Sequence, residues 1–264
     1  IVKILLSMFR YSLSVTCPNL AEAHAVRGFI KIFLDWDWAE AEKSLNRAVA
    51  LDPNSVEAHH WLGILYQIRG RFPDAKAELY RALELDPTSA NMMSDLGHIH
   101  FFSHEFEKAE ELFKTAESIE RYSTNPRLHF LYTKQGRELE TYQAFLDIYS
   151  KYMQPTQLES YQKVFETGGA KGVFRIHLNE ALDRLANGKS PRQTVAIDLY
   201  YAAIRYAQLG EKEKAIESLN RALQTRLRYE TMNFTFPFFA FDPTFDEIRN
   251  EPSFREVLRK MNLP

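Results

Sequence analysis

Three histidines in the middle of the chain have residue types and spacing that could support metal chemistry. His98, His100 and His104 lie close together, and the i, i+4 spacing of the last two would place their imidazoles on one face of a helix. The alternative is that His100 packs in a core and His104 occupies a turn, and the repeat pattern described below favours this alternative. We therefore expect no bound metal and no cofactor.

A group of carboxylates could in principle supply a general acid and a general base. Asp35, Asp37, Glu40 and Glu42 lie close together, and paired carboxylates do such work when their environments separate their pKa values. We interpret the group instead as a solvated turn followed by a helix start, where acidic side chains complement the helix dipole. No nucleophile stands beside a base in a recognisable context. We therefore expect no catalytic residues and predict that the chain is not an enzyme.

Two further patterns could bind phosphate. Residues 168–172 read Gly-Gly-Ala-Lys-Gly, but they lack the Gly-Lys-Ser/Thr order of a phosphate loop and follow a helical pattern rather than a strand. We interpret them as a turn between helices. Lys and Arg total 33 against 35 Asp and Glu, and a balanced chain has no broad field to attract a phosphate backbone. Nucleic acid is therefore not an expected partner.

The composition is that of a folded chain made mainly of helices. Hydrophobic residues make up 45% of its 264 residues, while Gly and Pro number only 10 and 11. The single cysteine, Cys17, excludes a disulfide framework. The first residue is Ile1, which suggests a piece of a longer chain, and the apolar run that follows is interrupted by Arg10. We expect no direct membrane contact, and we favour the cytoplasm with the periplasm as an alternative.

Self-comparison shows a repeat of 34 residues. Three blocks align end to end at 21–55, 56–89 and 90–123, and a fourth lies at 196–229. The first block has one extra residue, which falls in its turn at 34–38. Leu-Asp-Pro closes the first two blocks, where proline ends the second helix.

Small residues recur in register within each block. Gly28, Gly63, Gly97 and Ala203 fall where the first helix presses on its neighbour, and a larger side chain there would push the helix axes apart. Pairs of alanines seven apart mark one face of the second helix, with a large apolar residue between them that fills the core. The pairs with their central residues are Ala41, Leu45 and Ala48; Ala75, Leu79 and Ala82; Ala109, Phe113 and Ala116; and Ala215, Leu219 and Ala222.

These positions resemble the tetratricopeptide repeat (TPR). The resemblance implies an all-α fold, a right-handed superhelical solenoid of antiparallel helix hairpins with a C-terminal helical cap. Residues 1–20 then read as a partial repeat and 124–195 as irregular hairpins. The helical stretches expected in the irregular region are Leu128–Gln135, Leu139–Tyr152, Gln157–Glu166 and Val173–Ala186.

Residues 230–264 are expected to form a strap and a cap. Phe234, Phe236 and Phe238 alternate around Pro237, which favours an extended stretch, and a short helix should follow over 242–249. Pro252 should open a second helix. Its apolar stripe would consist of Phe254, Val257, Leu258 and Met261.

Some details are similar to the carboxyl-terminal repeat region of bacterial multi-domain signalling proteins. They are Trp36-Asp37-Trp38 followed by Ala41-Glu42, the pair Ala58-His59, and the ending that begins at Asp242-Pro243. Such proteins include winged-helix regulators, adenylate cyclases and Ser/Thr kinases. The resemblance implies that this chain carries no chemistry of its own and serves as a regulatory or sensing region.

The family also implies where a partner would bind, because the first helices of a TPR array line its concave side. At the family's contact positions this chain has Phe29, Phe33, His60, Trp61, Ile64, Gln67, Ser94, His98, Phe101, Phe102, Tyr200, Tyr201 and Ile204. We call this set the predicted partner surface. It is aromatic and nearly uncharged, which suits a protein or peptide. Alternatives are that some of these residues pack within the array or under the tail, or that the surface closes on a small ligand.

Members of the family that bind chaperones use Lys and Asn to hold a peptide's terminal carboxylate. The corresponding positions here are occupied by Ala25, Phe29, Trp61, Asn91 and Asp95. The resemblance therefore disfavours a co-chaperone role.

Overall fold

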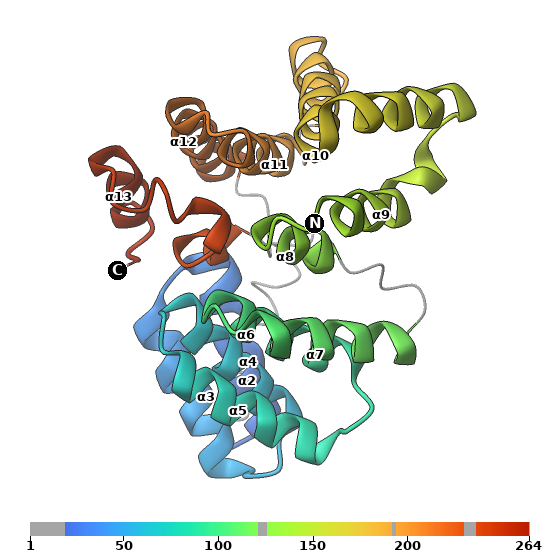
Figure 1. The fold of residues 1–264 in the computed structure, drawn as a ribbon. Coiled ribbons are helices and arrows are strands. Elements are labelled where there is room, and N and C mark those ends of the chain that lie inside the picture. Colours follow the sequence, from blue (N-terminus) through green and yellow to red (C-terminus); the bar gives the residue numbers. More distant parts are fainter. Residues whose placement is uncertain (1–18, 121–125, 192–193, 230–235, 264) are drawn as a thin grey trace. The chain divides into compact units, whose positions relative to one another are not determined.

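The computed structural model describes residues 19–120, 126–191, 194–229 and 236–263. Every regular element in these ranges is a helix, and Figure 1 shows consecutive helices as antiparallel pairs. The predicted all-α fold of helix hairpins is therefore confirmed. The partial repeat predicted at 1–20 lies almost wholly outside the described residues. The chain divides into two units, with the boundary between Ile99 and His100.

The first unit contains two complete hairpins. Helix α2 (Ala21–Ile30) continues into a π-helical turn, η1 (Lys31–Asp35), and pairs with α3 (Trp38–Leu51), while α4 (Val56–Ile68) pairs with α5 (Phe72–Leu85). Helix α6 (Ala90–Phe102) crosses the unit boundary. Ser55 caps α4 by accepting a hydrogen bond from the Ala58 N–H, at 3.3 Å.

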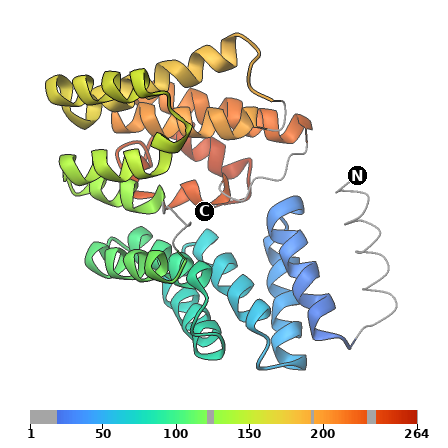
Figure 2. The same cartoon turned by 90° about the vertical axis from the view of Figure 1, so that its right-hand side faces the viewer.

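The second unit contains the remaining helices. They are α7 (Phe106–Ile119), α8 (Pro126–Lys134), α9 (Glu138–Tyr149) with a 3-10 turn η2 (Ser150–Tyr152), α10 (Pro155–Ala186), α11 (Val195–Gln208), α12 (Lys212–Tyr229), the 3-10 turns η3 (Phe236–Ala240) and η4 (Pro243–Phe245), and α13 (Pro252–Arg259). Figure 2 shows α11 and α12 lying against each other along their length.

One turn recurs within the hairpins and fixes how each second helix begins. The residue in the turn has a positive φ at Gly70 (72°), His104 (59°), Gly136 (70°) and Gly210 (78°). The N–H of the next residue donates to the carbonyl five residues back, as from Arg71 to Tyr66 at 2.8 Å and from Arg137 to Tyr132 at 3.0 Å. This left-handed helix ending favours glycine because a side chain crowds the backbone there. His104 occupies the same place without that freedom.

The small residues of the first helices lie where the two helices of a hairpin touch. A Cβ added at Gly63 would come within 2.6 Å of Leu79 Cδ2 and 3.2 Å of the Ala75 carbonyl oxygen. The alanines and central residues of the second helices in all four predicted blocks, such as Ala75, Leu79 and Ala82, are fully buried.

Gly63→Val is therefore expected to destabilise the first unit by about 1–3 kcal/mol, because extra volume in a packed interface forces side chains or backbone to move. Urea unfolding of the variant beside the unaltered protein measures this effect. Lys43→Val, at an exposed position on α3, is the control and is expected to change stability by about 0.5 kcal/mol or less. An unchanged midpoint for Gly63→Val would contradict the close approach of α4 and α5.

The extra residue of the first block lies in the π-helical turn rather than in the loop. Asp37 N–H donates to the Lys31 carbonyl at 3.0 Å, six residues back instead of five, and Trp36 has a φ of 53°. Gly28 still meets Leu45, because a Cβ on Gly28 would lie 2.4 Å from Leu45 Cγ. Helices α2 and α3 therefore pack in the same register as α4 and α5.

Residues 126–149 form a hairpin with the same turn as the clear repeats. The small position, seven residues before the turn glycine, is occupied by His129, and its ring contacts Phe145 with centroids 5.9 Å apart. Thr141 and Ile148 stand where alanines stand in the other second helices. The hairpin is thus built like a repeat, with a large polar residue at its closest contact.

Helix α10 combines two of the helical stretches expected from the sequence. Gly169, with φ 59° and ψ −160°, interrupts it, and Figure 1 shows the two halves of α10 running in different directions. This agrees with the expected turn between helices at 168–172. Glu138 on α9 lies so close to Gly169 that a Cβ at this position would clash with the Glu138 carboxylate.

The tail differs from its predicted form in two places. Residues 236–240 form a 3-10 turn and not an extended stretch. The turn buries Phe239 fully and leaves Phe238 partly exposed, whereas an extended stretch would place Phe236 and Phe238 on one face and Phe239 on the other. The helix expected over 242–249 is only a 3-10 turn, begun by the Asp242 carboxylate accepting from the Thr244 N–H at 2.8 Å. Phe234 lies outside the described residues. The helix that Pro252 opens is confirmed as α13, with its predicted apolar stripe buried.

Candidate functional site

The residues of the predicted partner surface differ in how far they are exposed. Eight are buried: Phe33, His60, Ile64, Gln67, Phe101, Phe102, Tyr200 and Ile204. Five are partly exposed: Phe29, Trp61, Ser94, His98 and Tyr201. Contact with a partner thus depends mainly on the second group, and the assignment of the whole set stays a prediction.

In the second unit, the tail of the chain covers part of this set. The ring of Phe102 lies 6.5 Å from that of Phe238, and the ring of Tyr200 lies 6.4 Å from that of Phe245. Lys134 on α8 also donates to the Pro243 carbonyl at 2.9 Å and to the Asp246 carboxylate at 2.7 Å. The chain itself therefore supplies neighbours to these aromatic side chains.

In the first unit, three aromatic residues of the set contact one another. Phe29 on α2 lies 5.0 Å from Phe33 and 4.8 Å from Trp61 on α4, and Phe33 lies 5.9 Å from Trp61, measured between ring centroids. We call these three residues the aromatic cluster. They come from the first helices of two successive hairpins, so the repeat itself brings them together. Phe29 and Trp61 leave part of their surface accessible.

A buried hydrogen bond between His60 and Asp95 holds one side of the aromatic cluster. His60 Nε2 lies 2.9 Å from an Asp95 carboxylate oxygen, and the His60 ring stacks on Trp61 with centroids 4.6 Å apart and planes 20° apart. The pairing of His60 with Asp95 was not among the contacts predicted from the sequence. The sequence does contain a signal for this contact, because the two residues are 35 positions apart. This separation is one block plus one residue, so they occupy adjacent positions in the first helices of successive blocks. This pair fixes the orientation of the Trp61 indole.

His100 and His104, which were considered for metal chemistry, each lie near a different carboxylate. His100 is buried and lies 2.5 Å from a Glu105 carboxylate oxygen, whereas His104 is exposed in the turn, 3.9 Å from Asp246. Across the ranges that the structure describes, no group of three or more metal-ligating side chains comes together. This geometry fits the expected core and turn positions of the two residues.

The acidic group at residues 35–42 is a helix start. The Asp37 carboxylate accepts from the Glu40 N–H at 3.2 Å, and Glu40 and Glu42 pair with Arg27 and Arg71 at 2.8 and 2.7 Å. The interpretation of these acids as helix capping and surface charge is confirmed. None of these contacts resembles a catalytic pair of carboxylates.

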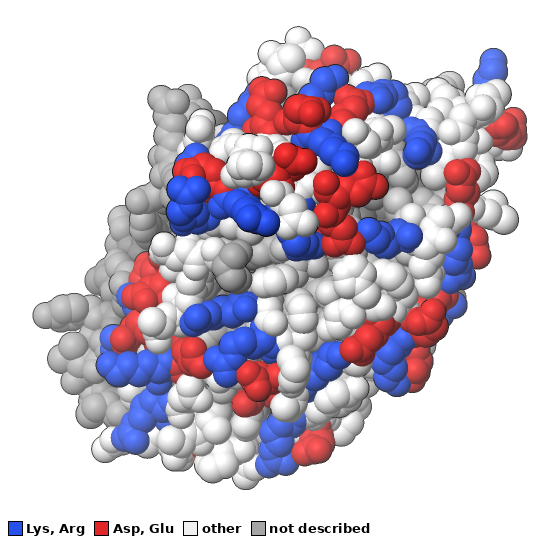
Figure 3. Space-filling model, turned by 60° about the vertical axis from the view of Figure 1, so that its left-hand side comes forward, with Lys and Arg blue, Asp and Glu red and all other residues white. Residues whose placement is uncertain are grey.

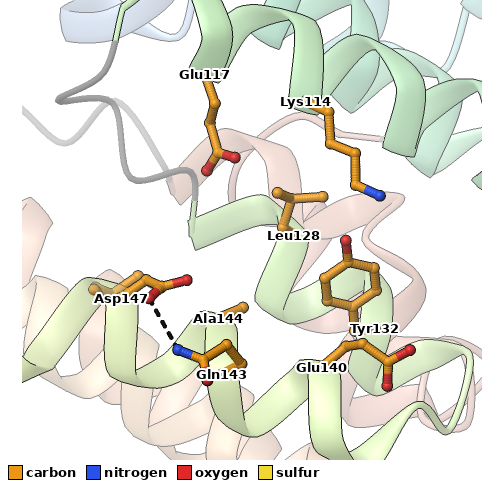
Figure 4. A pocket seen from close by; sticks show the side chains of 9 residues that line it. Lys114, Glu117, Leu128, Tyr132, Glu140, Gln143, Ala144 and Asp147 are labelled. Atoms are coloured by element: carbon orange, nitrogen blue, oxygen red, sulfur yellow. Dashed lines mark hydrogen bonds between the residues drawn. The ribbon is translucent and has the colours of Figure 1, made fainter.

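A cleft of about 250 Å³ lies between α7, α8 and α9. Figure 4 shows Tyr132 and Lys114 pointing toward each other, with Leu128 beside them. Next to the cleft, Glu110 accepts hydrogen bonds from Arg137 at 2.7 Å and Tyr132 at 3.1 Å. Burial alone would raise the pKa of Glu110, but Lys114, Arg137 and Tyr132 outweigh burial and hold it at about 2. Because these charges neutralise one another, they stabilise the contact between the helices and do not form an acid–base site.

Charged residues on the face drawn in Figure 3 alternate in sign. Lys and Arg lie beside Asp and Glu, without a broad region of either sign on the described residues in that view. Charged residues of the described helices often form ion pairs between neighbouring helical turns, such as Lys108 with Glu111 at 2.8 Å. Such pairs contribute little to stability individually.

Two sequence models of the tetratricopeptide repeat match the chain. One matches residues 44–77, from the second half of α3 into α5, and the other matches residues 206–227, covering a recurrent turn and α12. The chain contains tetratricopeptide repeats. Both matched segments lie within the TPR blocks expected from the sequence.

Several solved structures are similar to this chain to different degrees. The APC/C hetero-tetramer Cut9–Hcn1 matches with a TM-score of 0.55 and 14% identity, over 97% of this chain and 45% of that chain. YrrB, described as a TPR protein with an unusual peptide-binding site, matches with a TM-score of 0.45 and 15% identity, over 83% and 92% of the two chains. MamA matches with a TM-score of 0.44 and 18% identity, over 79% and 92%. At 14% identity, the likeness to Cut9–Hcn1 concerns the fold alone.

No curated protein matches the sequence significantly. Among the described helices, none is long and apolar enough to cross a membrane.

Proposed function

We propose that this chain is a non-catalytic TPR scaffold that binds a polypeptide, and that the aromatic cluster is the centre of its binding surface. The observation that carries the proposal is the contact of Phe29, Phe33 and Trp61 across two successive first helices, with Phe29 and Trp61 still partly exposed. Stacked repeats create extended binding surfaces of this kind. Aromatic side chains dominate binding energy because they bury a large area at a small entropic cost.

The expected occupant is a peptide segment with an apolar side chain that packs among the three rings. The His60–Asp95 pair holds Trp61 before the partner arrives, which lowers the entropic cost of binding. Ser94 and His98 on α6 are partly exposed members of the same predicted surface in this unit. They would provide polar contacts at its edge.

The likeness to repeat regions of bacterial signalling proteins adds a proposed context. It rests on Trp36-Asp37-Trp38, Ala58-His59 and the Asp242-Pro243 ending. In that context the chain would report the binding of its partner to a separate domain. Joining this chain to the neighbouring domain of its natural protein, and measuring that domain's activity with and without the peptide, tests this part of the proposal.

Trp61→Ala is expected to weaken peptide binding by about 2 kcal/mol or more, which corresponds to roughly a thirtyfold rise in Kd. Peptides selected from a random display library against the unaltered protein provide the ligands, and fluorescence anisotropy gives each Kd. Phe29→Ala is expected to act in the same direction with a smaller effect.

Tyr80→Ala is the matched control for these variants. Tyr80 is a similarly large aromatic residue, 44% exposed, on the second helix α5, and its removal is expected to leave Kd unchanged. If Tyr80→Ala weakened binding while Trp61→Ala did not, the binding surface would lie on the second helices and the proposal would be wrong.

A further inference from the structure

A positively charged side chain is buried among α8, α9, α10 and α11 in the second unit. Arg205 is only 4% exposed, and its Nη1 donates at 2.7 Å to both His129 Nε2 and Gln208 Oε1. Its guanidinium also faces the ring of Phe174 at 4.7 Å. Within the described part of the chain, no carboxylate forms an ion pair with Arg205. Burying a charge without a counter-charge is costly.

His129 cannot compensate this charge. Its Nδ1 lies 3.1 Å from the Thr141 carbonyl oxygen, which can only accept, so Nδ1 carries the proton and Nε2 accepts from Arg205. Burial, together with the charge of Arg205, keeps the pKa of His129 well below its usual value. The imidazole is therefore neutral and serves as an acceptor, while the guanidinium stays charged.

Two more polar groups near Arg205 have no partner. The side-chain nitrogen Nε2 of Gln208 and the ring nitrogen Nδ1 of His177 are buried without a hydrogen bond. The Tyr149 hydroxyl is a neighbour of the guanidinium. We call Arg205, His177, Gln208 and Tyr149 the guanidinium cluster. Buried polar groups in proteins are nearly always satisfied, and here two unsatisfied nitrogens lie around one positive charge.

The guanidinium cluster reaches the surface of its unit. Gln208 follows Arg205 by three residues and Tyr201 precedes it by four, so the three side chains lie along one face of α11. Gln208, Tyr201, His177 and Tyr149 are each partly exposed. Arg205 itself is buried, so a ligand group reaches the guanidinium only when these partly exposed side chains move.

We propose that the guanidinium cluster binds a carboxylate group. A carboxylate supplies the missing negative charge and only acceptor oxygens, and its plane matches the fork of a guanidinium. A single buried cation balances one carboxylate, whereas a doubly charged phosphate would leave a net negative charge in the same interior. The guanidinium cluster lies in the second unit and shares no residue with the aromatic cluster of the first unit.

The carboxylate comes either from the end of a peptide or from a small free acid, and a set of three probes distinguishes these sources. The probes are N-acetyl-trialanine with a free terminal carboxylate, the same peptide as its amide, and acetate, each titrated at ionic strength held constant with NaCl. Isothermal calorimetry gives the affinity, and the melting temperature gives an independent measure. The peptide acid should bind saturably and raise the melting temperature, and the amide should not.

Acetate identifies the source. If acetate binds as tightly as the peptide acid, the site takes a small free carboxylate, and if it binds much more weakly, the site takes a peptide terminus. If neither acid binds beyond the effect of NaCl, or if the amide binds as well as the acid, the proposal is wrong.

Variants of Gln208 and His177, which carry the two unpaired nitrogens, locate the binding. Gln208→Leu and His177→Phe keep the buried charge and similar side-chain volumes, and each is expected to raise the Kd for the bound acid at least tenfold. Arg205→Met should abolish binding, whereas Arg221→Met, at an exposed arginine on α12, should leave it unchanged. If Gln208→Leu and His177→Phe both bind the acid as tightly as the unaltered protein does, the carboxylate binds elsewhere. Trp61→Ala should not affect these affinities, which separates this test from that of the proposed function.

Discussion

Phe254→Ala is expected to lower the free energy of unfolding of the second unit by about 3–5 kcal/mol, the usual cost of replacing a buried phenylalanine by alanine. Phe254 is fully buried on α13, and its ring lies 5.4 Å from Phe239 and 6.0 Å from Phe245. The three rings tie α13 to η3 and η4, and α13 in turn packs on α12. Alanine would leave a cavity at the centre of this contact.

Urea unfolding followed by circular dichroism measures the effect, and a dye that binds exposed apolar surface reports whether α12 is uncovered. The control is Tyr152→Ala, because Tyr152 is a large aromatic side chain in the same unit but is 76% exposed. We expect the control to change stability by about 0.5 kcal/mol or less. If Phe254→Ala unfolds like the control, α13 is not a stabilising cap, and its apolar stripe is better interpreted as a docking segment for another molecule.

The second unit is also expected to lose stability when the pH falls from 7 to 5, by about 2 kcal/mol from His177 alone. Burial, with the charges of Arg205 and Arg184, lowers the pKa of His177 to about 3, whereas a histidine in an unfolded chain titrates near pH 6.5. Between these values the unfolded chain binds a proton that the folded chain does not. Stability is therefore full above pH 6.5 and falls as the pH drops through it. His129 acts in the same direction because its pKa is also lowered.

Urea unfolding at several pH values between 7.5 and 5 measures this dependence. His177→Phe is the matched variant, because a phenyl ring can keep the contacts of His177 with Phe145 at 5.3 Å and Tyr149 at 4.6 Å. The variant should lose less stability over the same interval. Glu110, with its pKa at about 2, titrates below this interval and does not mask the effect. Equal losses in the variant and the unaltered protein would contradict the assignment to His177.

The sequence predicted the parts of the fold that depend on local spacing. The small residue of each first helix, the alanine pairs and the turn glycines are short-range features, and the contacts of Gly63 with Leu79 follow directly from them. The hairpin at 126–149 looks irregular in the sequence because His129, Thr141 and Ile148 occupy positions where the repeat has small residues. Its spacing is nevertheless regular, since Phe145 follows His129 by the same interval that separates Leu79 from Gly63.

The features that were missed depend on contacts between distant segments. Packing of some surface residues under the tail was one of the expected alternatives, but no period in the sequence indicates that Phe102 and Tyr200 are the ones that contact Phe238 and Phe245. The 3-10 turn at 236–240 is set by packing of Phe239 against Phe254, which outweighs the alternation of the neighbouring phenylalanines. Arg205 lies in a stretch that fits the repeat, but its partner His129 is 76 residues away. The guanidinium cluster therefore could not be found from the sequence.

The π-helical turn at Lys31–Asp35 has a consequence for how such a chain tolerates changes in length. An inserted residue in a helix would normally rotate everything after it by about 100° and carry apolar side chains away from the core. Here the widened turn absorbs the added residue before α3 begins, and Leu45 meets Gly28 just as Leu79 meets Gly63. This one added residue therefore leaves the contact of α2 with α3 in the same register as the contact of α4 with α5. Natural variation in the length of a block should concentrate at the ends of first helices, where it leaves the packing of the neighbouring hairpins unchanged.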